Sequence, residues 1–286
     1  MAQTKITETM KYILSIAIIL AATFLNPVRA DIAGQGIYLR IVDDADAAVK
    51  AGDFAKAEQL YMEAMQLQPD NNGNILLLSN LGMVRFYMGN DSLALITLDE
   101  AHSIAPKSTT ILLNRARVRL VNGMAAEALE DYELVSSIDP DQPDPYFYKG
   151  MIELSGGLLD RAEADFTRLR ELDPEGDNTS LAWARLLVIK KRHSEAISYL
   201  NRLIDHEKSS DYLASRALCH LMIGNLGEAA EDIADGLALA PDDGMLYLYR
   251  AMLNKRRYQP SQAKADGNKA VELGVKREVV DALLKN

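Results

Sequence analysis

The stretch Thr109–Pro140, TTILLNRARVRLVNGMAAEALEDYELVSSIDP, contains two runs of apolar residues at helical spacing, separated by a glycine. Gly123 ends the first run, because glycine commonly follows the last residue of a helix, and the closing proline cannot continue the second. A small residue lies within each run, Ala116 in the first and Ala128 in the second. Small side chains let two helices approach closely. The stretch therefore predicts a helical hairpin.

The same features recur along the chain when Thr109 is taken as position 1 of a repeating frame. Position 20 is always alanine: Ala57, Ala94, Ala128, Ala162, Ala196, Ala229 and Ala263. Position 8 is always small: Ala45, Gly82, Ala116, Gly150, Ala184, Ala217 and Ala251. Position 15 is glycine in five copies: Gly52, Gly89, Gly123, Gly157 and Gly224. Position 32 is proline in five copies: Pro69, Pro106, Pro140, Pro174 and Pro241.

Position 24 of the quoted stretch is the aromatic Tyr132. The pattern resembles the tetratricopeptide repeat family, which has a period of about 34 residues and the same small, aromatic and proline marks. The resemblance extends from about Tyr38 to Lys276. It implies an all-α fold, a right-handed superhelical solenoid of about seven helix-turn-helix units. We expect a signal peptide at residues 1–30, the solenoid at 31–274 and a capping helix at 275–286, because the end of a repeat stack needs a polar outer face.

Two copies depart from the pattern. The fifth has Lys191 at position 15, lacks the closing proline and continues into the polar segment Ile204–Ser210, where we expect any softer joint of the solenoid. The seventh has Tyr258 at position 15 and Gly267 where an aromatic residue is expected.

Charged residues at positions 7 and 23 occur together. Four copies carry a base at position 7 and an acid at position 23: Arg115 with Asp131, Lys149 with Asp165, Arg216 with Asp232, and Arg250 with Asp266. The other three copies carry Asp44 with Leu60, Leu81 with Thr97, and Trp183 with Tyr199. Because both positions are about equally far from the turn, they face each other across the hairpin, and we predict four ion pairs. Their net stabilisation is expected to be small.

The N-terminus has the pattern of a secretory signal peptide. A polar start with two lysines precedes the apolar run Tyr12–Leu25, and small residues precede a cleavage site after Ala30. Fourteen apolar residues are fewer than the roughly 20 that a membrane helix needs. We therefore expect a periplasmic or secreted protein with no membrane span in the mature chain, and an uncleaved anchor is the alternative. Cys219 is the only cysteine, so neither acylation at the cleavage site nor an intramolecular disulfide is expected.

The charge of the chain disfavours nucleic acids and anionic membranes as partners. The net charge is −10, and the first 30 residues contribute +2, so the remainder carries −12.

No catalytic or metal-binding pattern is evident. The four histidines, His102, His193, His206 and His220, do not pair with other ligand residues at a metal-binding spacing. The sequence has no His-Glu-x-x-His, no glycine-rich phosphate loop and no nucleophile elbow. We expect no enzymatic activity, no catalytic residue, no cofactor and no metal.

The family resemblance implies where a partner binds. In tetratricopeptide repeat proteins the first helices of successive hairpins line a concave groove through positions 2, 5, 9, 12 and 13. The candidate partner-binding residues at these positions are Met83, Tyr87, Arg117, Phe147, Met151 and Arg185. Exposed apolar grooves usually bind partners, and arginine suits a carboxylate. The alternative is that tight winding buries many of these residues. Position 9 lacks the Lys and Asn clamp of the co-chaperone branch, so chaperone tails are not expected.

We therefore predict a non-enzymatic scaffold in the periplasm of a Gram-negative bacterium that holds a protein or peptide partner in its groove. The alternative is a structural subunit of a multi-protein envelope or secretion assembly, bound through its convex face or its ends. The sequence names neither the partner nor the oligomeric state.

Overall fold

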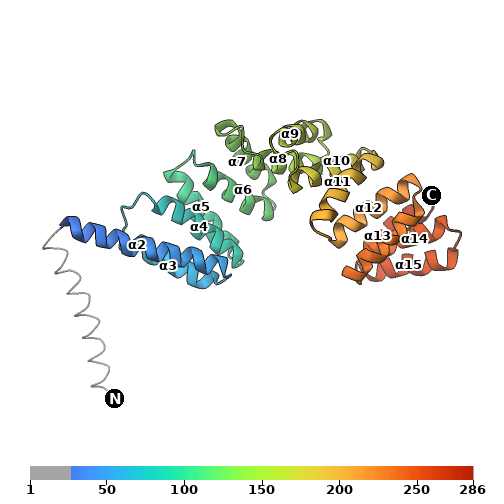
Figure 1. Cartoon of the computed structure of the whole chain (residues 1–286), viewed down its shortest axis with the longest axis horizontal. Helices are drawn as coiled ribbons and strands as arrows, with labels where there is room; N and C mark the ends of the chain where they lie inside the picture. The colour runs from blue at the N-terminus through green and yellow to red at the C-terminus, as the bar shows by residue number, and fades with distance from the viewer. Residues whose placement is uncertain (1–26, 286) are drawn as a thin grey trace, which may run out of the picture. The chain divides into compact units, whose positions relative to one another are not determined.

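A computed structural model describes residues 27–285, with side chains from residue 34 onward. Most of the predicted signal peptide, residues 1–26, therefore lies outside the described residues. Across residues 27–285 the chain forms fifteen helices and no strand, so the predicted all-α repeat solenoid is confirmed (Figure 1). None of the helices described here combines the length and the apolar character that a membrane crossing requires.

The helices form seven consecutive hairpins and one last helix, and the chain divides into two compact units between Asp139 and Pro140. The helices on either side of Ile204–Ser210, the segment where we expected any softer joint, pack against each other within the second unit.

The first unit contains three hairpins (Figure 1). They are α2 (Pro27–Lys50) with α3 (Phe54–Leu67), α4 (Asn74–Tyr87) with α5 (Asp91–Ile104), and α6 (Thr109–Val121) with α7 (Ala125–Ile138). Each second helix also packs against the first helix of the next hairpin, α3 against α4 and α5 against α6. The apolar face of each hairpin is thereby buried by its neighbour, as in other repeat proteins.

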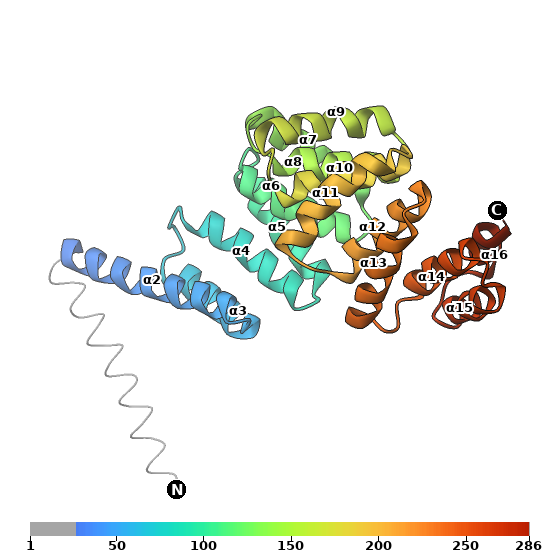
Figure 2. The same ribbon diagram turned by 45° about the vertical axis from the view of Figure 1, so that its right-hand side comes forward.

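The second unit contains four hairpins and the last helix (Figure 2). They are α8 (Asp144–Ser155), α9 (Leu159–Leu172), α10 (Asp177–Ile189), α11 (His193–His206), α12 (Ser210–Ile223), α13 (Leu226–Leu239), α14 (Gly244–Arg256), α15 (Pro260–Glu272) and α16 (Arg277–Lys285). Helix α16 packs on α14 and α15, and Val280 is buried there with Leu248 and Ala270. It therefore covers part of the last hairpin of this unit, and its role as a cap stays a prediction.

The turn within each hairpin has one backbone geometry in all seven copies. Position 15 has a positive φ in every copy, including Lys191 at 58° and Tyr258 at 59°, where the other five have glycine. The next amide donates to the carbonyl five residues earlier, as from Gln259 to Asn254 at 2.8 Å. This is the hydrogen bond of a Schellman motif. The two departures from glycine therefore leave the turn intact.

The small residues at position 8 contact the larger residues at position 24. A Cβ added to Gly82 would lie 2.6 Å from Leu98 Cγ, and one added to Gly150 would lie 2.3 Å from Phe166 Cε1. Both distances are far shorter than a van der Waals contact, so glycine at position 8 matches the side chain it faces in these two hairpins.

All four predicted ion pairs are confirmed. The shortest N–O distances are 2.7 Å for Arg115–Asp131, 3.1 Å for Lys149–Asp165, 2.6 Å for Arg216–Asp232 and 2.6 Å for Arg250–Asp266. In the fifth copy the same two positions hold Trp183 and Tyr199, whose rings stack with centroids 6.2 Å apart. The two positions therefore meet across the hairpin in charged and uncharged copies alike.

The structure adds a third member to these pairs, which the sequence did not indicate to us. The residue at position 11 lies one helical turn after position 7, and its side chain also reaches the residue at position 23. Arg119 donates to Asp131 at 2.8 Å, and Asn254 donates to Asp266 at 2.8 Å. In the second copy Arg85 donates to the Thr97 hydroxyl at 2.5 Å. In these three copies the residue at position 23 thus accepts a hydrogen bond from a side chain of the first helix, whether or not it is acidic.

Candidate functional site

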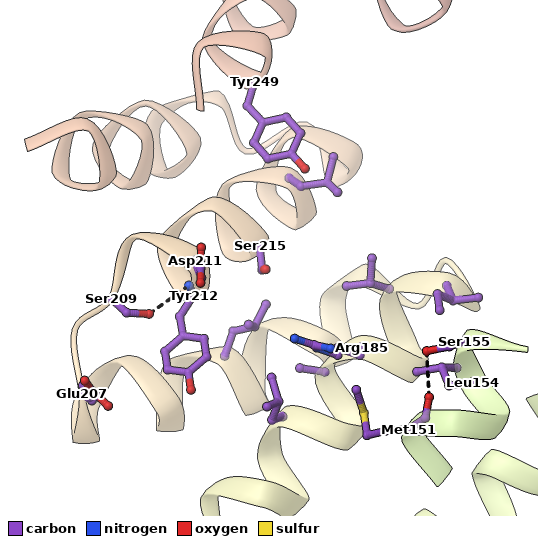
Figure 3. A pocket seen from close by; sticks show the side chains of 16 residues that line it. Met151, Leu154, Ser155, Arg185, Glu207, Ser209, Asp211, Tyr212, Ser215 and Tyr249 are labelled. Atoms are coloured by element: carbon purple, nitrogen blue, oxygen red, sulfur yellow. Dashed lines mark hydrogen bonds between the residues drawn. The ribbon is translucent and has the colours of Figure 1, made fainter. Parts of the chain in front are cut away.

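The first helices of the second unit enclose a pocket of about 650 Å³ (Figure 3). Helices α8, α10, α12 and α14 supply most of its wall. Its apolar lining residues are Met151, Leu154, Leu181, Ala184, Val188, Ile189, Leu200, Leu218 and Tyr249, the last through its ring. We call this pocket the groove pocket.

The groove pocket exists because the repeats are in phase. Position 9 carries Met151, Arg185 and Leu218 on three consecutive first helices, and all three residues line the pocket. Residues at equal positions of stacked hairpins face the same side, so position 9 forms a row across the unit. The first helices, which the family resemblance implied as the wall of a groove, supply most of the residues that line this pocket.

Arg185 brings a positive charge into this apolar surface. Its side chain is exposed and extends into the pocket between Met151 and Tyr212 (Figure 3). Among residues 34–285 no hydrogen bond, ion pair or ring contact to Arg185 is found. Charge-assisted hydrogen bonds from a guanidinium to a carboxylate are among the strongest in proteins. The pocket therefore offers an unoccupied two-point donor.

The opposite charge lies at one edge of the groove pocket, around the start of α12. Glu207 and Asp211 supply carboxylates there, and the Ser209 hydroxyl accepts a hydrogen bond from the Tyr212 amide at 3.3 Å. Burial raises the pKa of Tyr249 to about 12, so its phenol remains protonated at neutral pH. The pocket thus has a cation on its floor, carboxylates at one edge and an apolar surface between them.

The six predicted binding residues do not form one site in the structure. Met151 and Arg185 line the groove pocket together. Met83 and Tyr87 line a smaller pocket of about 250 Å³ in the first unit, where Met83 is largely buried and the exposed Tyr87 ring stacks on Phe54 at 5.2 Å.

The remaining two predicted residues line neither pocket. Phe147 is buried in the core of the second unit, with its ring edge-on to Tyr148 at a centroid distance of 5.1 Å. Arg117 is exposed on α6. For Phe147 the alternative that packing buries the residue therefore applies, because its side chain fills space between helices.

The sequence interpretation missed several lining residues. Ser215 and Tyr249 occupy position 6, and Tyr212 occupies position 3. Position 6 lies three residues before position 9, on the same helix face, so helical spacing was a signal that could have identified Ser215 and Tyr249. Glu207 and Ser209 belong to the connection before α12, whose course the repeat pattern does not specify.

Within residues 34–285 no group of three or more His, Cys, Asp or Glu side chains is arranged to hold a metal ion. Cys219 is fully buried, and burial raises the pKa of its thiol to about 11. A protonated, inaccessible thiol is a poor nucleophile.

Comparison with known proteins agrees with the architecture. Residues 45–71 and 181–244 match sequence models of the tetratricopeptide repeat. The crystal structure of a tetratricopeptide repeat protein from Parabacteroides merdae is similar with a TM-score of 0.63 and 28% identity, over 87% of this chain and 97% of that chain. No curated protein sequence matches this chain.

Two further solved structures share the fold at lower identity. PilF from Pseudomonas aeruginosa gives a TM-score of 0.68 at 14% identity, over 77% of this chain and 99% of that chain. YrrB, described as a tetratricopeptide repeat protein with an unusual peptide-binding site, gives 0.54 at 15% identity, over 66% of this chain and 98% of its own.

Proposed function

Because this chain is a tetratricopeptide repeat protein, we propose that it is a non-enzymatic interaction scaffold that holds a peptide or helix of a partner protein in the groove pocket. Proteins built from these repeats are generally non-catalytic scaffolds for protein–protein interaction. The proposal goes further by assigning the binding surface to the second unit.

The observation that carries this proposal is the exposed Arg185 on the floor of an apolar pocket of about 650 Å³. Apolar side chains of a partner segment would replace water over Met151, Leu181 and Leu218, which is favourable in proportion to the area buried. A side-chain or C-terminal carboxylate of the same segment would bond to Arg185. The carboxylates at the edge near α12 would favour a basic residue or an amide donor there.

We further propose that the scaffold works in the periplasm or outside the cell. The support is the sequence pattern of residues 1–30, a basic start followed by an apolar run and a small-residue cleavage site. A partner in the cell envelope follows from that location.

Groove binding is tested with two single variants, each of which removes one arginine. The partner captured by the mature chain from envelope fractions would be purified and titrated against the wild type, R185A and R192A. Arg192 is an equally charged but peripheral control, because it pairs with Glu195 on the surface and lines no part of the groove pocket. We expect R185A to weaken binding about tenfold or more, in line with the roughly 1.5–3 kcal/mol of a charged hydrogen bond.

R192A should bind as the wild type does. Unchanged affinity for R185A, or an equal loss in both variants, would refute binding through the groove pocket.

The second candidate function is a structural subunit of a multi-protein envelope or secretion assembly, bound through the convex face or the ends. An exposed tyrosine and exposed apolar residues near the C-terminal end of the second unit favour it. Truncation before residue 275 would then disrupt assembly, whereas R185A would not.

A further inference from the structure

A second hollow of about 460 Å³ lies at the C-terminal end of the second unit. It is lined by residues of α12, α14, the following turn and α16: Met222, Met252, Lys255, Arg256, Tyr258 and Leu283. We call these six residues the C-terminal patch. The patch shares no lining residue with the groove pocket. It therefore forms a separate surface of the same unit.

Tyr258 is unusual in both its backbone and its side chain. Its φ of 59° lies in the left-handed region, where a Cβ raises the energy and where five other copies have glycine. Its side chain is 93% exposed, so it gains almost nothing from packing. The hydrogen bonds of the turn are made by backbone atoms and do not need the ring. The backbone hydrogen bonds hold the turn, and the ring is available for contact with another molecule.

The patch is also locally basic in an acidic protein. Lys255, Arg256 and Arg257 are consecutive, and the side chains of all three donate to backbone carbonyls, those of Leu284, Leu221 and Leu226 respectively. Within residues 34–285 none of the three forms an ion pair with a carboxylate. A neutral carbonyl satisfies a hydrogen bond but leaves the full positive charge. Across residues 34–285 no carboxylate therefore neutralises this cluster of cations, in a chain whose net charge is −10.

Apolar groups stand next to these cations. Met222 and Leu283 are exposed, and Met252 is buried at the base of the hollow. Methionine adapts to varied ligand shapes, and an exposed tyrosine offers a rigid amphipathic contact that loses little conformational entropy on binding. Aromatic, methionine and arginine residues are the types enriched at protein interfaces.

We propose that the C-terminal patch is a second docking site, which takes an acidic segment of a partner protein that carries an apolar side chain next to its carboxylates. The carboxylates lie against Lys255 and Arg256, and the apolar side chain enters the hollow beside Tyr258. An anionic membrane fits less well, because the patch is small and the rest of the chain would be repelled by negative lipid headgroups. The site acts independently of the groove pocket.

The test uses the mature full chain and a short fluorescein-labelled peptide with leucine and glutamate on one face, read by fluorescence anisotropy. The central variant is Y258G, because glycine removes the ring and suits the positive φ, so the fold is preserved. K191G is the matched control, since Lys191 has the same φ at the same turn position of the fifth repeat but lies outside the patch.

We expect both variants to melt at or above the wild-type temperature. Y258G should weaken peptide binding about tenfold or more, the loss typical of a central aromatic contact, and K191G should not change it. A peptide with glutamine in place of every glutamate should bind more weakly, and added salt should weaken binding of the glutamate peptide. R185A should leave this binding unchanged, which separates it from groove binding.

Several outcomes would overturn the assignment. They are no measurable peptide binding by the wild type, equal binding by Y258G, or equal affinity for the glutamine peptide. Dimers of the wild type that Y258G converts to monomers in sedimentation would assign the patch to a second copy of the chain instead. Binding to phosphatidylglycerol vesicles without peptide binding would assign it to a membrane surface.

Discussion

Removal of one partner from the buried ion pair of the third repeat should destabilise the protein more than removal of both. The Arg115 and Asp131 side chains are only 8% and 4% exposed, and two hydrogen bonds of 3.0 and 2.7 Å join them. D131A leaves the buried guanidinium with Asp99 alone, which is 55% exposed. Breaking a buried pair in this way typically costs about 3–5 kcal/mol. We expect D131A to lose stability in that range.

The double variant R115L/D131T should recover most of this loss. It installs the pair that the second repeat already uses, Leu81 with Thr97. Arg119 occupies position 11, from which Arg85 donates to Thr97 in that repeat, so it is placed to donate to the new hydroxyl. Replacing a buried ion pair by apolar and hydrogen-bonded groups is often neutral. We expect the double variant to lie within about 1–2 kcal/mol of the wild type.

An exposed pair provides the internal control. Arg250 is 38% exposed, so D266A lets the guanidinium reach water. Partly exposed pairs contribute little, and D266A should therefore cost less than D131A. Urea unfolding followed by circular dichroism would give the free energies of unfolding. Hydrogen exchange of the α6 and α7 amides would show whether the loss is local, because repeat proteins can depart from two-state unfolding.

A D131A variant no less stable than the double variant would refute this account of the pair. So would a D266A variant destabilised as strongly as D131A.

Three further predictions concern the second unit. G150A should destabilise the protein by about 1–3 kcal/mol in thermal or urea unfolding, because its Cβ meets the buried Phe166 ring, which outweighs the gain of about 1 kcal/mol in helix propensity. E153Q should stabilise the protein near neutral pH, because burial and the nearby Asp165 raise the pKa of Glu153. The wild type therefore loses stability as the pH rises from the ordinary glutamate pKa through the raised one. In unfolding measured as a function of pH, the advantage of E153Q should vanish in acid. Cys219 should react with a thiol reagent at neutral pH only as fast as the unit opens, and equal rates in the native and urea-unfolded chain would contradict its burial.

The repeat pattern predicted the fold well because it records local packing. Alanine at position 20 and a small residue at position 8 are imposed by helix contact distances within a hairpin, which depend little on the rest of the chain. The ion pairs were predictable for the same reason, since Arg216 and Asp232 lie equally far from their own turn. Lys191 shows that the turn keeps its positive φ even where position 15 is not glycine.

The binding surface was predicted less completely because exposure depends on how successive hairpins stack. Phe147 occupies a groove position in the frame but fills the space between helices. Tyr249 lines the groove pocket from a position that the family rule omits. The role of Tyr258 was not evident either, since the sequence marks a missing glycine but does not show that the ring stands in solvent.

The most direct test of the proposed scaffold function is site-specific photo-crosslinking in cells. A benzoylphenylalanine would replace Ile189, which lines the groove pocket and is 50% exposed, or Leu158, which is 49% exposed and lies outside that pocket. We predict a discrete crosslinked protein partner from position 189 that R185A abolishes, and none from position 158. The same adduct from both positions, or an adduct at 189 that persists in R185A, would contradict partner binding in the groove pocket.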